Sequence, residues 1–181
     1  MPSPALASLA GFERKVIVGL GDLVVSNNQD MALTACSLGS CLGVTVYDPV
    51  FRVGGMLHAM LPDSSVSAAK AAEQPGMFVD TGMEALLRAV YALKAGKHRL
   101  QICVAGGAQF LGKSGYFNIG QRNYASLTQL LERQGLSIEA KDVGGQVSRT
   151  MSLHLGAGEV CLKSSGQNEE TILFRGYANI G

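Results

Sequence analysis

One cysteine and one histidine lie near two apolar segments that the sequence predicts to be neighbouring strands. These segments, LGVTVY and VGGMLHAML, flank Asp48 and Pro49, a dipeptide that favours a turn. If residues 48–51 form the turn of a hairpin, Cys41 lies directly opposite His58, with Cβ atoms roughly 4.5–5.5 Å apart. A neutral imidazole can accept a thiol proton, which activates the sulfur and lowers the pKa of the cysteine. The spacing alone also fits a buried cysteine beside a core histidine.

The residues immediately before Cys41 are Leu38, Gly39 and Ser40. A glycine permits a tight approach of the backbone to the strand. Backbone N–H groups near Ser40 and Cys41 could then bind the negative oxygen that forms when a thiol attacks a carbonyl. We therefore expect Gly39 and Ser40 to support a site in which Cys41 is the nucleophile and His58 is the base.

A second motif, GAQFLGKS at residues 107–114, satisfies the GxxxxGK[ST] pattern of a phosphate-binding loop. Such a loop needs a helix that begins at its Lys-Ser pair, because the first N–H groups of that helix face the phosphate. Gly115 and Gly120 weaken a helix at this point. Asp142 is the one plausible magnesium ligand near a strand end. The sequence therefore favours a glycine-rich loop with a solvated Lys113 over a nucleotide site.

Other polar residues have less specific patterns. His98 lies in a basic connection and His154 alternates within a predicted strand, so we expect His98 to be exposed and His154 to be structural. Arg122 and Asn123 open a predicted helix, where they could cap it or brace the glycine-rich loop. Asp142, which precedes a Gly-Gly pair, could form a turn or support the site.

Composition excludes several classes of protein. The 181 residues include 15 basic and 14 acidic side chains, a net charge of +1, which argues against nucleic-acid binders and polybasic membrane-surface proteins. Hydrophobic residues make up 47 % and charged residues 16 %, which is too apolar for a disordered chain. No segment reaches the roughly 18 apolar residues of a membrane helix. The four cysteines form no CxxC pair, so we expect no metal site and a cytoplasmic location.

Hydrophobic periodicity predicts an α+β (mixed α/β) fold with about eight strands and two main helices. The helices are expected at residues 80–95 and 121–134, where apolar side chains recur at helical spacing. Residues 15–163 then form one domain. We expect a flexible arm before it, residues 1–14, and a polar tail after it, residues 164–181.

Three stretches carry a family resemblance. They are residues 38–62 (LGSCLGVTVYDPVFRVGGMLHAMLP), residues 106–123 (GGAQFLGKSGYFNIGQRN) and residues 142–151 (DVGGQVSRTM). In order and spacing they resemble the chemoreceptor glutamine deamidase family, CheD. The resemblance spans the chain from about residue 16 to residue 162, and the LGSC…GGMxHxMLP unit is more specific than a lone phosphate-loop match.

The resemblance implies a cytoplasmic bacterial protein-glutamine glutaminase that converts glutamines of methyl-accepting chemotaxis receptors to glutamates. Cys41 would form a thioester with the glutamine, and His58 would serve as base and then as acid. The implied fold is a packed β-sheet core flanked by helices, similar to the catalytic domain of the cytotoxic necrotizing factor toxins. Neither a metal nor an organic cofactor is implied. The implied partners are receptor cytoplasmic domains and, in some organisms, the phosphatase CheC.

One position departs from the family pattern. Members usually carry a threonine five or six residues before the cysteine, where it orients the histidine, but Cys36 and Ala35 occupy those positions here. Thr34 could take that role if a bulge re-aims the strand. Otherwise a nearby serine or a backbone carbonyl would orient His58. The departure leaves a second hypothesis, a catalytically weakened adaptor that binds receptors or CheC.

Overall fold

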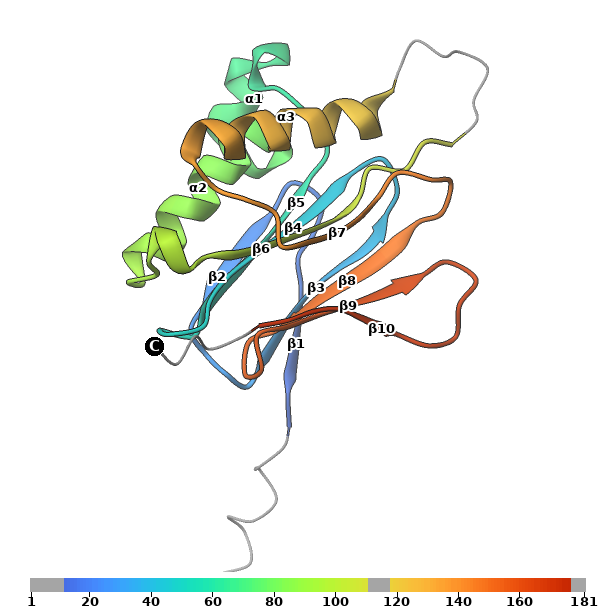
Figure 1. Cartoon of the computed structure of the whole chain (residues 1–181). Coiled ribbons are helices and arrows are strands. Elements are labelled where there is room, and N and C mark those ends of the chain that lie inside the picture. Colours follow the sequence, from blue (N-terminus) through green and yellow to red (C-terminus); the bar gives the residue numbers. More distant parts are fainter. Residues whose placement is uncertain (1–11, 111–117, 177–181) are drawn as a thin grey trace, which may run out of the picture.

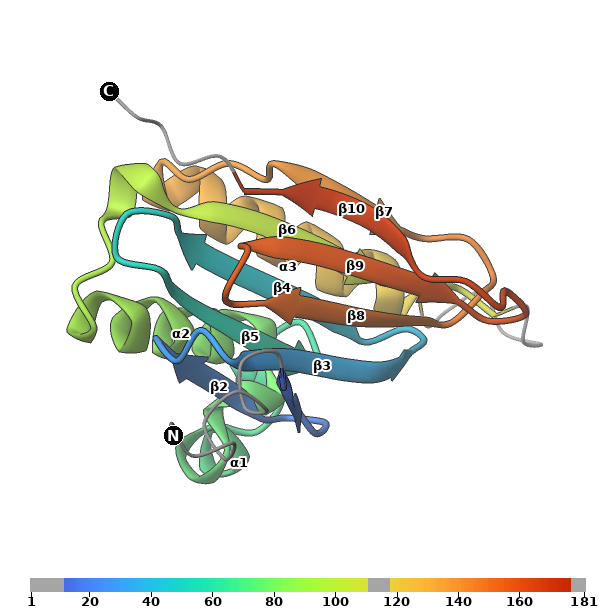
Figure 2. The ribbon, with the colours of Figure 1, turned by 90° about the horizontal axis from the view of Figure 1, so that it is seen from below.

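The computed structural model describes residues 12–110 and 118–176 and arranges them in three layers (Figure 1). Two five-stranded sheets face each other, and the helices cover the outer face of one of them. The same layers are seen from below in Figure 2, where the sheet that contains β3, β8, β9 and β10 lies in front of the helices. This arrangement confirms the predicted α+β class.

Each sheet combines strands from distant parts of the chain. Sheet A has the order β1 (Arg14–Ile17), β3 (Met31–Leu38), β8 (Arg149–His154), β9 (Glu159–Ser164), β10 (Thr171–Arg175). Sheet B has the order β2 (Leu23–Ser26), β5 (Val53–Ala59), β4 (Leu42–Asp48), β6 (Gln101–Gly106), β7 (Ala140–Val143). The helices are α1 (Ala68–Glu73), α2 (Val79–Ala92) and α3 (Ile119–Gln134), with 3₁₀ turns η1 (Ser64–Val66), η2 (Pro75–Met77) and η3 (Lys97–Arg99).

Sheet B is the middle layer, and every residue of its central strands β4 and β5 is buried. Alternate side chains of these strands pack against α2 and α3, among them Leu42, Val44 and Leu57, which join Met83 and Leu127 in one core cluster. Strands that are covered on both faces have apolar side chains on both, and this explains the long apolar runs in the sequence.

The opposite face of sheet B packs against sheet A. This inter-sheet core includes Leu38, Met56, Met151 and Leu153. Gly43 lets the sheets approach, because a Cβ atom there would lie only 2.7 Å from Cδ1 of Leu38. The side of β4 and β5 that faces sheet A is therefore enclosed by protein.

The β4–β5 pairing differs from the sequence prediction by two residues. Gly43, rather than Cys41, lies opposite His58, so the prediction of direct pairing was wrong. Because side chains on a strand alternate with a period of two, a two-residue shift keeps the same face. Cys41 accordingly packs against the inter-sheet core, on the side of sheet B to which His58 belongs.

The hairpin turn explains this shift. The turn occupies residues 49–52 instead of 48–51, and Asp48 pairs with Val53 as the last residue of β4. The Asp48 carboxylate accepts hydrogen bonds from the turn, and Arg52 takes a left-handed φ of 53°. The side chain of Asp48 thus stabilises a loop that begins one residue later than the sequence suggested.

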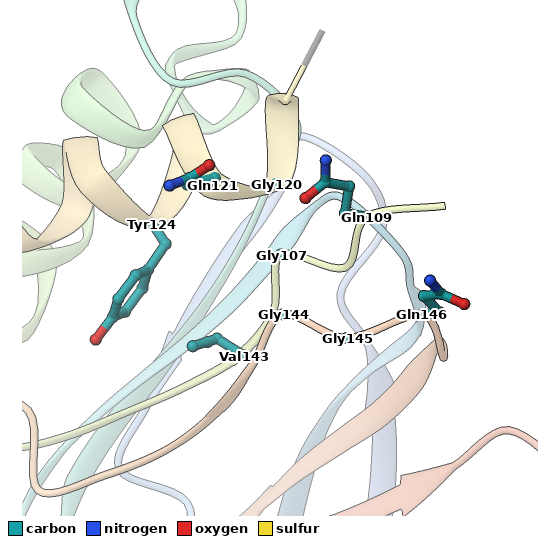
Figure 3. Close-up of a pocket in the computed structure, with 9 residues that line it drawn as sticks. All are labelled: Gly107, Gln109, Gly120, Gln121, Tyr124, Val143, Gly144, Gly145 and Gln146. Carbon is teal, nitrogen blue, oxygen red and sulfur yellow. The ribbon is translucent and has the colours of Figure 1, made fainter. Parts of the chain in front are cut away.

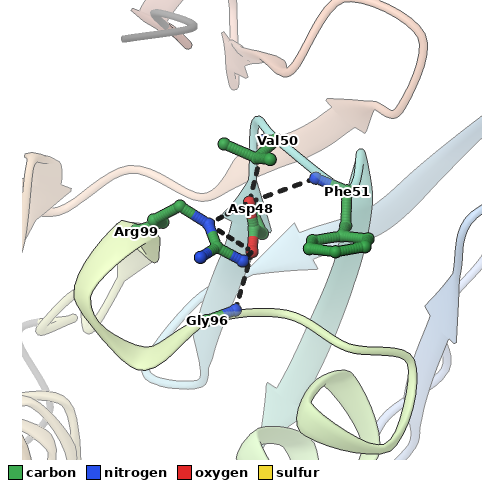
Figure 4. A network of polar contacts seen from close by, with 5 residues as sticks. All are labelled: Asp48, Val50, Phe51, Gly96 and Arg99. Carbon is green, nitrogen blue, oxygen red and sulfur yellow. Dashed lines mark hydrogen bonds and ion pairs between the residues drawn. The ribbon is translucent and has the colours of Figure 1, made fainter. Parts of the chain in front are cut away.

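The same carboxylate joins the hairpin to the connection between α2 and β6 (Figure 4). Asp48 is fully buried and accepts hydrogen bonds from the N–H groups of Val50 (2.8 Å), Phe51 (3.3 Å) and Gly96 (2.7 Å). The guanidinium of Arg99 adds an ion pair at 2.8 Å. Burial raises the pKa of Asp48, but Arg99 and the three N–H groups outweigh it, so the net pKa lies below the ordinary value.

The segment expected to be a polar tail contributes a strand. Thr171–Arg175 pairs with β9 at the edge of sheet A, where its residues are exposed or half-buried and its hydrophobic period is weak. Most of the expected arm, residues 1–11, lies outside the described residues, and Arg14 already pairs with Met31.

Among the helices within residues 12–110 and 118–176, none combines the length and apolarity needed to cross a membrane.

We expect Asp48→Ala to lower the free energy of unfolding by about 3 kcal/mol, because it leaves buried N–H groups unpaired. Urea unfolding measures this loss. The stability that the carboxylate contributes should be complete above about pH 5 and should be lost as pH falls through its lowered folded-state pKa. Arg175→Ala, which removes an exposed ion pair with Glu159, is the control and should change little. Equal losses in both variants would contradict the prediction.

Candidate active site

The turn between β3 and β4, residues 39–41, carries Cys41. Each of its three consecutive carbonyl oxygens accepts a hydrogen bond from a later segment of the chain. The donor–acceptor pairs are Ala108 N–H to Gly39 O (2.8 Å), Asn123 Nδ2–H to Ser40 O (3.0 Å) and Gly107 N–H to Cys41 O (2.8 Å). The loop after β6 and the start of α3 therefore fix the backbone around the thiol.

These bonds also determine where the N–H groups of the turn point. The Ser40–Cys41 peptide is trans, so its N–H points away from its carbonyl. Asn123 holds the carbonyl, and the Cys41 N–H lies on the other side, close to its own thiol. Within the described part of the chain, the turn's hydrogen bonds to other residues use its carbonyls and neither the Ser40 nor the Cys41 N–H. Both donors remain available for an oxyanion.

Two glycines allow the segments around the turn to come this close. At Gly106, which has a φ of 108°, a Cβ atom would overlap the Cys41 carbonyl oxygen. At Gly120, near the start of α3, a Cβ atom would lie 2.5 Å from the carbonyl oxygens of Gly107 and Ala108. A side chain at either position would push the clamping segments away from the turn.

His58 lies near the end of β5, and its side chain is only 6 % exposed. Its Nδ1 lies 3.1 Å from the carbonyl oxygen of Val18. A carbonyl can only accept, so this contact assigns the proton to Nδ1 and leaves Nε2 with a free lone pair. No hydrogen bond joins His58 to the Cys41 thiol among the residues that the structure describes, although such contacts often tighten only when substrate binds.

Burial favours the neutral form of both groups. It lowers the pKa of His58, and the Val18 carbonyl and the charge of Asp22 offset this only in part. Burial also raises the pKa of the Cys41 thiol, which its own N–H only partly offsets. The direction for Cys41 is opposite to the lowered value that the spacing suggested. A neutral imidazole can still accept the thiol proton at the moment of attack.

Thr34 does not contact His58 in this structure. β3 has a bulge, but it lies between Ala35 and Leu38, after Thr34. The Thr34 hydroxyl is buried 3.0 Å from that of Ser152, on the face of β3 opposite to Ala35. The Val18 carbonyl described above is the group that orients the imidazole, one of the alternatives that the sequence left open.

Two polar residues support the loops near the site. Asn123 does not cap α3, whose N-cap is Asn118, and among the described residues its amide donates to the Cys41 turn. Arg149, which the sequence analysis missed, is buried and donates to the carbonyls of Gly106 and Gly144 while pairing with Asp142 at 2.9 Å. Asp142 is thus a polar support. The sequence did contain a signal for Arg149. It shares the alternation of Met151 and Leu153, so an arginine stands at a core-facing position of the strand.

A pocket of about 520 Å³ opens beside these loops (Figure 3). Glycine backbone and uncharged side chains line it: Gly107, Gln109, Gly120, Gln121, Tyr124, Val143, Gly144, Gly145 and Gln146. Gln109 and Gly120 also line a hollow of about 190 Å³ that includes Ser40. The hollow thus borders the Cys41 turn and the larger pocket adjoins the hollow, and no charged side chain lines the larger pocket.

Residues 111–117, which include Lys113 and Ser114 of the phosphate-loop motif, lie outside the described residues. Among the described residues, the next helix after the motif begins at Ile119. The preference for a glycine-rich loop with a solvated Lys113 over a nucleotide site therefore stays a prediction.

The other two histidines lie away from the Cys41 turn. His98 is exposed in η3, before the end of β6 that is distant from Gly106. His154 contacts the Glu13 carboxylate at 2.9 Å. Neither His98 nor His154 belongs to the candidate site.

Metal ligands come together elsewhere in the described part of the chain. His154, Cys161 and Glu170 offer ligand atoms that all lie within 4.8 Å of one another, donors of the types that zinc accepts. They lie on the outer face of sheet A, because the adjacent Leu153 points into the inter-sheet core. A metal at this cluster would be on the far side of sheet A from His58.

Comparisons with known proteins identify relatives. The family model described as CheD chemotactic sensory transduction matches residues 60–164. The probable chemoreceptor glutamine deamidase CheD 1 of Syntrophus aciditrophicus (strain SB) is 44% identical over 151 residues, which cover 83% of this chain and 94% of that protein. The family match begins after His58, so it bears on the family and not on the two candidate catalytic side chains.

Further relatives have similar coverage. The probable chemoreceptor glutamine deamidase CheD of Solibacter usitatus (strain Ellin6076) is 39% identical over 158 residues, 87% of this chain and 94% of that one. The corresponding CheD 2 of Anaeromyxobacter dehalogenans (strain 2CP-C) is 41% identical over 152 residues, 84% of this chain and 96% of that one. A Neisseria meningitidis protein of known structure aligns with a TM-score of 0.37 and 15% identity over 72% of this chain and 58% of its own, too distant to bear on the site.

We expect iodoacetamide to alkylate Cys41 selectively in a Cys36→Ser background, because Cys103 and Cys161 are buried and their pKa values are raised to about 12. The rate should rise with pH through a midpoint above the ordinary thiol pKa of about 8.5, since only the thiolate reacts and burial raises the pKa of Cys41. Peptide mass spectrometry across pH 6–11 measures the profile. A midpoint below pH 7 would instead indicate a preformed thiolate–imidazolium pair.

Proposed function

This chain belongs to the CheD family, and we propose on that premise that it deamidates glutamine side chains of methyl-accepting chemotaxis receptors, with Cys41 as nucleophile. The observation that carries the proposal is the turn at residues 39–41. Its three carbonyl oxygens accept hydrogen bonds from the loop after β6 and from α3, and two N–H groups remain available beside the Cys41 thiol. That arrangement is what an acyl-transfer site needs.

The substrate class rests on two further observations. The relatives are named as probable chemoreceptor glutamine deamidases. The pocket that shares Gln109 and Gly120 with the hollow at Ser40 is lined by glycines and by uncharged side chains such as Gln109 and Gln121. A neutral carboxamide enters such a surface without the desolvation cost of a charged group.

In the first half of the proposed reaction, the Cys41 sulfur attacks the carboxamide carbon of the receptor glutamine. The Nε2 atom of His58 accepts the thiol proton as the C–S bond forms. The carbonyl oxygen becomes negative and accepts hydrogen bonds from the Ser40 and Cys41 N–H groups. His58 then gives its proton to the amide nitrogen, the C–N bond breaks, and ammonia leaves a thioester behind.

In the second half, water hydrolyses the thioester. His58 accepts a proton from the water as its oxygen attacks the thioester carbon. The C–S bond then breaks, the sulfur of Cys41 regains a proton, and the receptor carries a glutamate. The sum is glutamine plus water giving glutamate plus ammonia, with no change in oxidation state, so the reaction as written needs no cofactor.

The substrate also suggests where the protein works. Receptor glutamines that become methylation sites are on the cytoplasmic part of the receptor in the family's implied role, so we place this enzyme in the cytoplasm. CheC remains a proposed second partner, and its support is the family resemblance alone.

A specific observation favours one alternative function. Ala35 and Cys36 stand where the family's threonine is expected, and the described residues show no hydrogen bond between Cys41 and His58. A weakened third member slows a catalytic unit without abolishing it. A chain with such a site could instead bind receptors or CheC as an adaptor, without turnover.

The deamidase proposal predicts amide-to-acid conversion when the full chain is incubated with a glutamine-bearing receptor cytoplasmic domain. Cys41→Ala and His58→Ala should each lower the conversion rate by at least about 10³-fold, because each removes a group that acts in the transition state. Peptide mass spectrometry measures the conversion.

Cys36→Ser is the matched control, because Cys36 is exposed on β3 and takes no part in the proposed chemistry. It should convert the receptor at the wild-type rate. Receptor binding without conversion, by a folded wild-type protein on several receptors, would favour the adaptor over the enzyme.

A further inference from the structure

Asn123 links two segments of the chain, one beside each residue of the candidate catalytic pair. It lies near the start of α3 and is fully buried. Its Nδ2 atom donates to the carbonyl of Ser40 at 3.0 Å and to the carbonyl of Met60 at 2.9 Å. Ser40 directly precedes Cys41, and Met60 follows His58 by two positions. One amide group therefore holds the segments that carry the proposed nucleophile and the proposed base.

The chemistry of this position is specific to a primary amide. Two carbonyl oxygens need two donors, and the NH₂ group of Asn123 supplies both from one uncharged atom. A carboxylate would repel both oxygens, and a hydroxyl could bind only one. The Oδ1 atom of Asn123 has no hydrogen-bond partner within the described residues. A buried acceptor left unpaired is unfavourable. We therefore infer that the two donated hydrogen bonds are the reason for an asparagine at this position.

We propose that Asn123 is a positioning residue that fixes the Ser40–Cys41 peptide plane, so that the Cys41 N–H faces the substrate oxygen. The inference rests on the proposed role of Cys41 as nucleophile. Rotation of this trans peptide would move the N–H and the carbonyl together. The hydrogen bond to the Ser40 carbonyl opposes that rotation. The bond to Met60 anchors the amide of Asn123 itself.

A neighbouring contact separates this role from ordinary structural support. Ser126, one turn further along α3, donates to the carbonyl of Pro62 at 2.6 Å. This bond also ties α3 to the segment after β5, but it does not touch the Cys41 turn. Ser126→Ala is therefore a matched control that removes a comparable anchor and leaves the peptide plane held.

The test compares two reagents that react with Cys41 by different routes. p-Nitrophenyl acetate acylates a thiol through a tetrahedral oxyanion and releases p-nitrophenolate. Iodoacetamide alkylates the same sulfur by direct displacement of iodide and forms no oxyanion. Both rates are measured on the full chain in a Cys36→Ser background, and the rate of a Cys41→Ala protein is subtracted. Thermal unfolding verifies that each variant is folded.

We expect Asn123→Ala to slow acylation at least about tenfold while alkylation stays within about twofold, because only acylation needs the oriented N–H. Asn123→Ser, whose hydroxyl can bind one carbonyl, should fall between the wild type and Asn123→Ala. Ser126→Ala should leave both rates unchanged. A selective loss of acylation in the folded variants supports the proposal.

Several results would overturn it. These are a parallel fall of both rates, no fall in either rate, an equal effect of Ser126→Ala, or a failure of both Asn123 variants to fold, which would make the residue a folding determinant. Receptor conversion is not used in this test. The Asn123 variants can show the selective loss of acylation while the wild type converts no receptor. That outcome would refute the deamidase and leave the positioning role intact.

Discussion

Hydrogen bonds to the three backbone carbonyls of the turn at residues 39–41 are the constraint on which the candidate site depends. Their donors come from the loop after β6 and from α3. β6 is placed by its pairing with β4, and α3 is placed by apolar packing on sheet B. Arg149 ties the loop after β6 to the loop after β7 from the side of sheet A. All three layers of the fold therefore contribute to the geometry of one turn.

Burial controls the chemistry of the two candidate catalytic groups more than direct pairing does. Enclosure between the sheets lowers the pKa of His58 and raises that of Cys41. Both shifts favour the neutral form, and a neutral thiol resists oxidation and alkylation because those reactions need the thiolate. In the proposed mechanism, the sulfur is activated only as it attacks the substrate carbonyl.

The sequence predicted the parts of the structure that depend on local patterns. Alternation revealed β4 and β5, and helical spacing in α2 revealed the stripe of Met83, Leu86 and Val90. The pairing register was missed by two residues because the side chain of Asp48 reshapes the turn, a hydrogen-bonding effect that hydropathy does not contain. The edge strand β10 was missed because its exposed residues have little hydrophobic period.

The polar supports of the candidate site were harder to predict, because they depend on contacts between distant segments. Asn123 reaches Ser40 across 83 positions, and Arg149 reaches Gly106 across 43. Local patterns suggested a helix cap or a brace of the glycine-rich loop for Asn123, and no role for Arg149. The Val18 carbonyl beside His58 is a backbone group that no residue pattern specifies.

The separation between Ser40 and Asn123 also orders events during synthesis. In a growing chain, Cys41 and His58 leave the ribosome long before Asn123 does, and long-range contacts form late in folding. Until then the thiol sits in a turn whose carbonyls have none of their later partners. A truncated or nicked chain that ends before α3 would contain both candidate catalytic side chains yet lack the framework that orients them. Under the proposed mechanism, nascent and damaged copies would lack the oriented N–H group that speeds attack on the amides of neighbouring proteins.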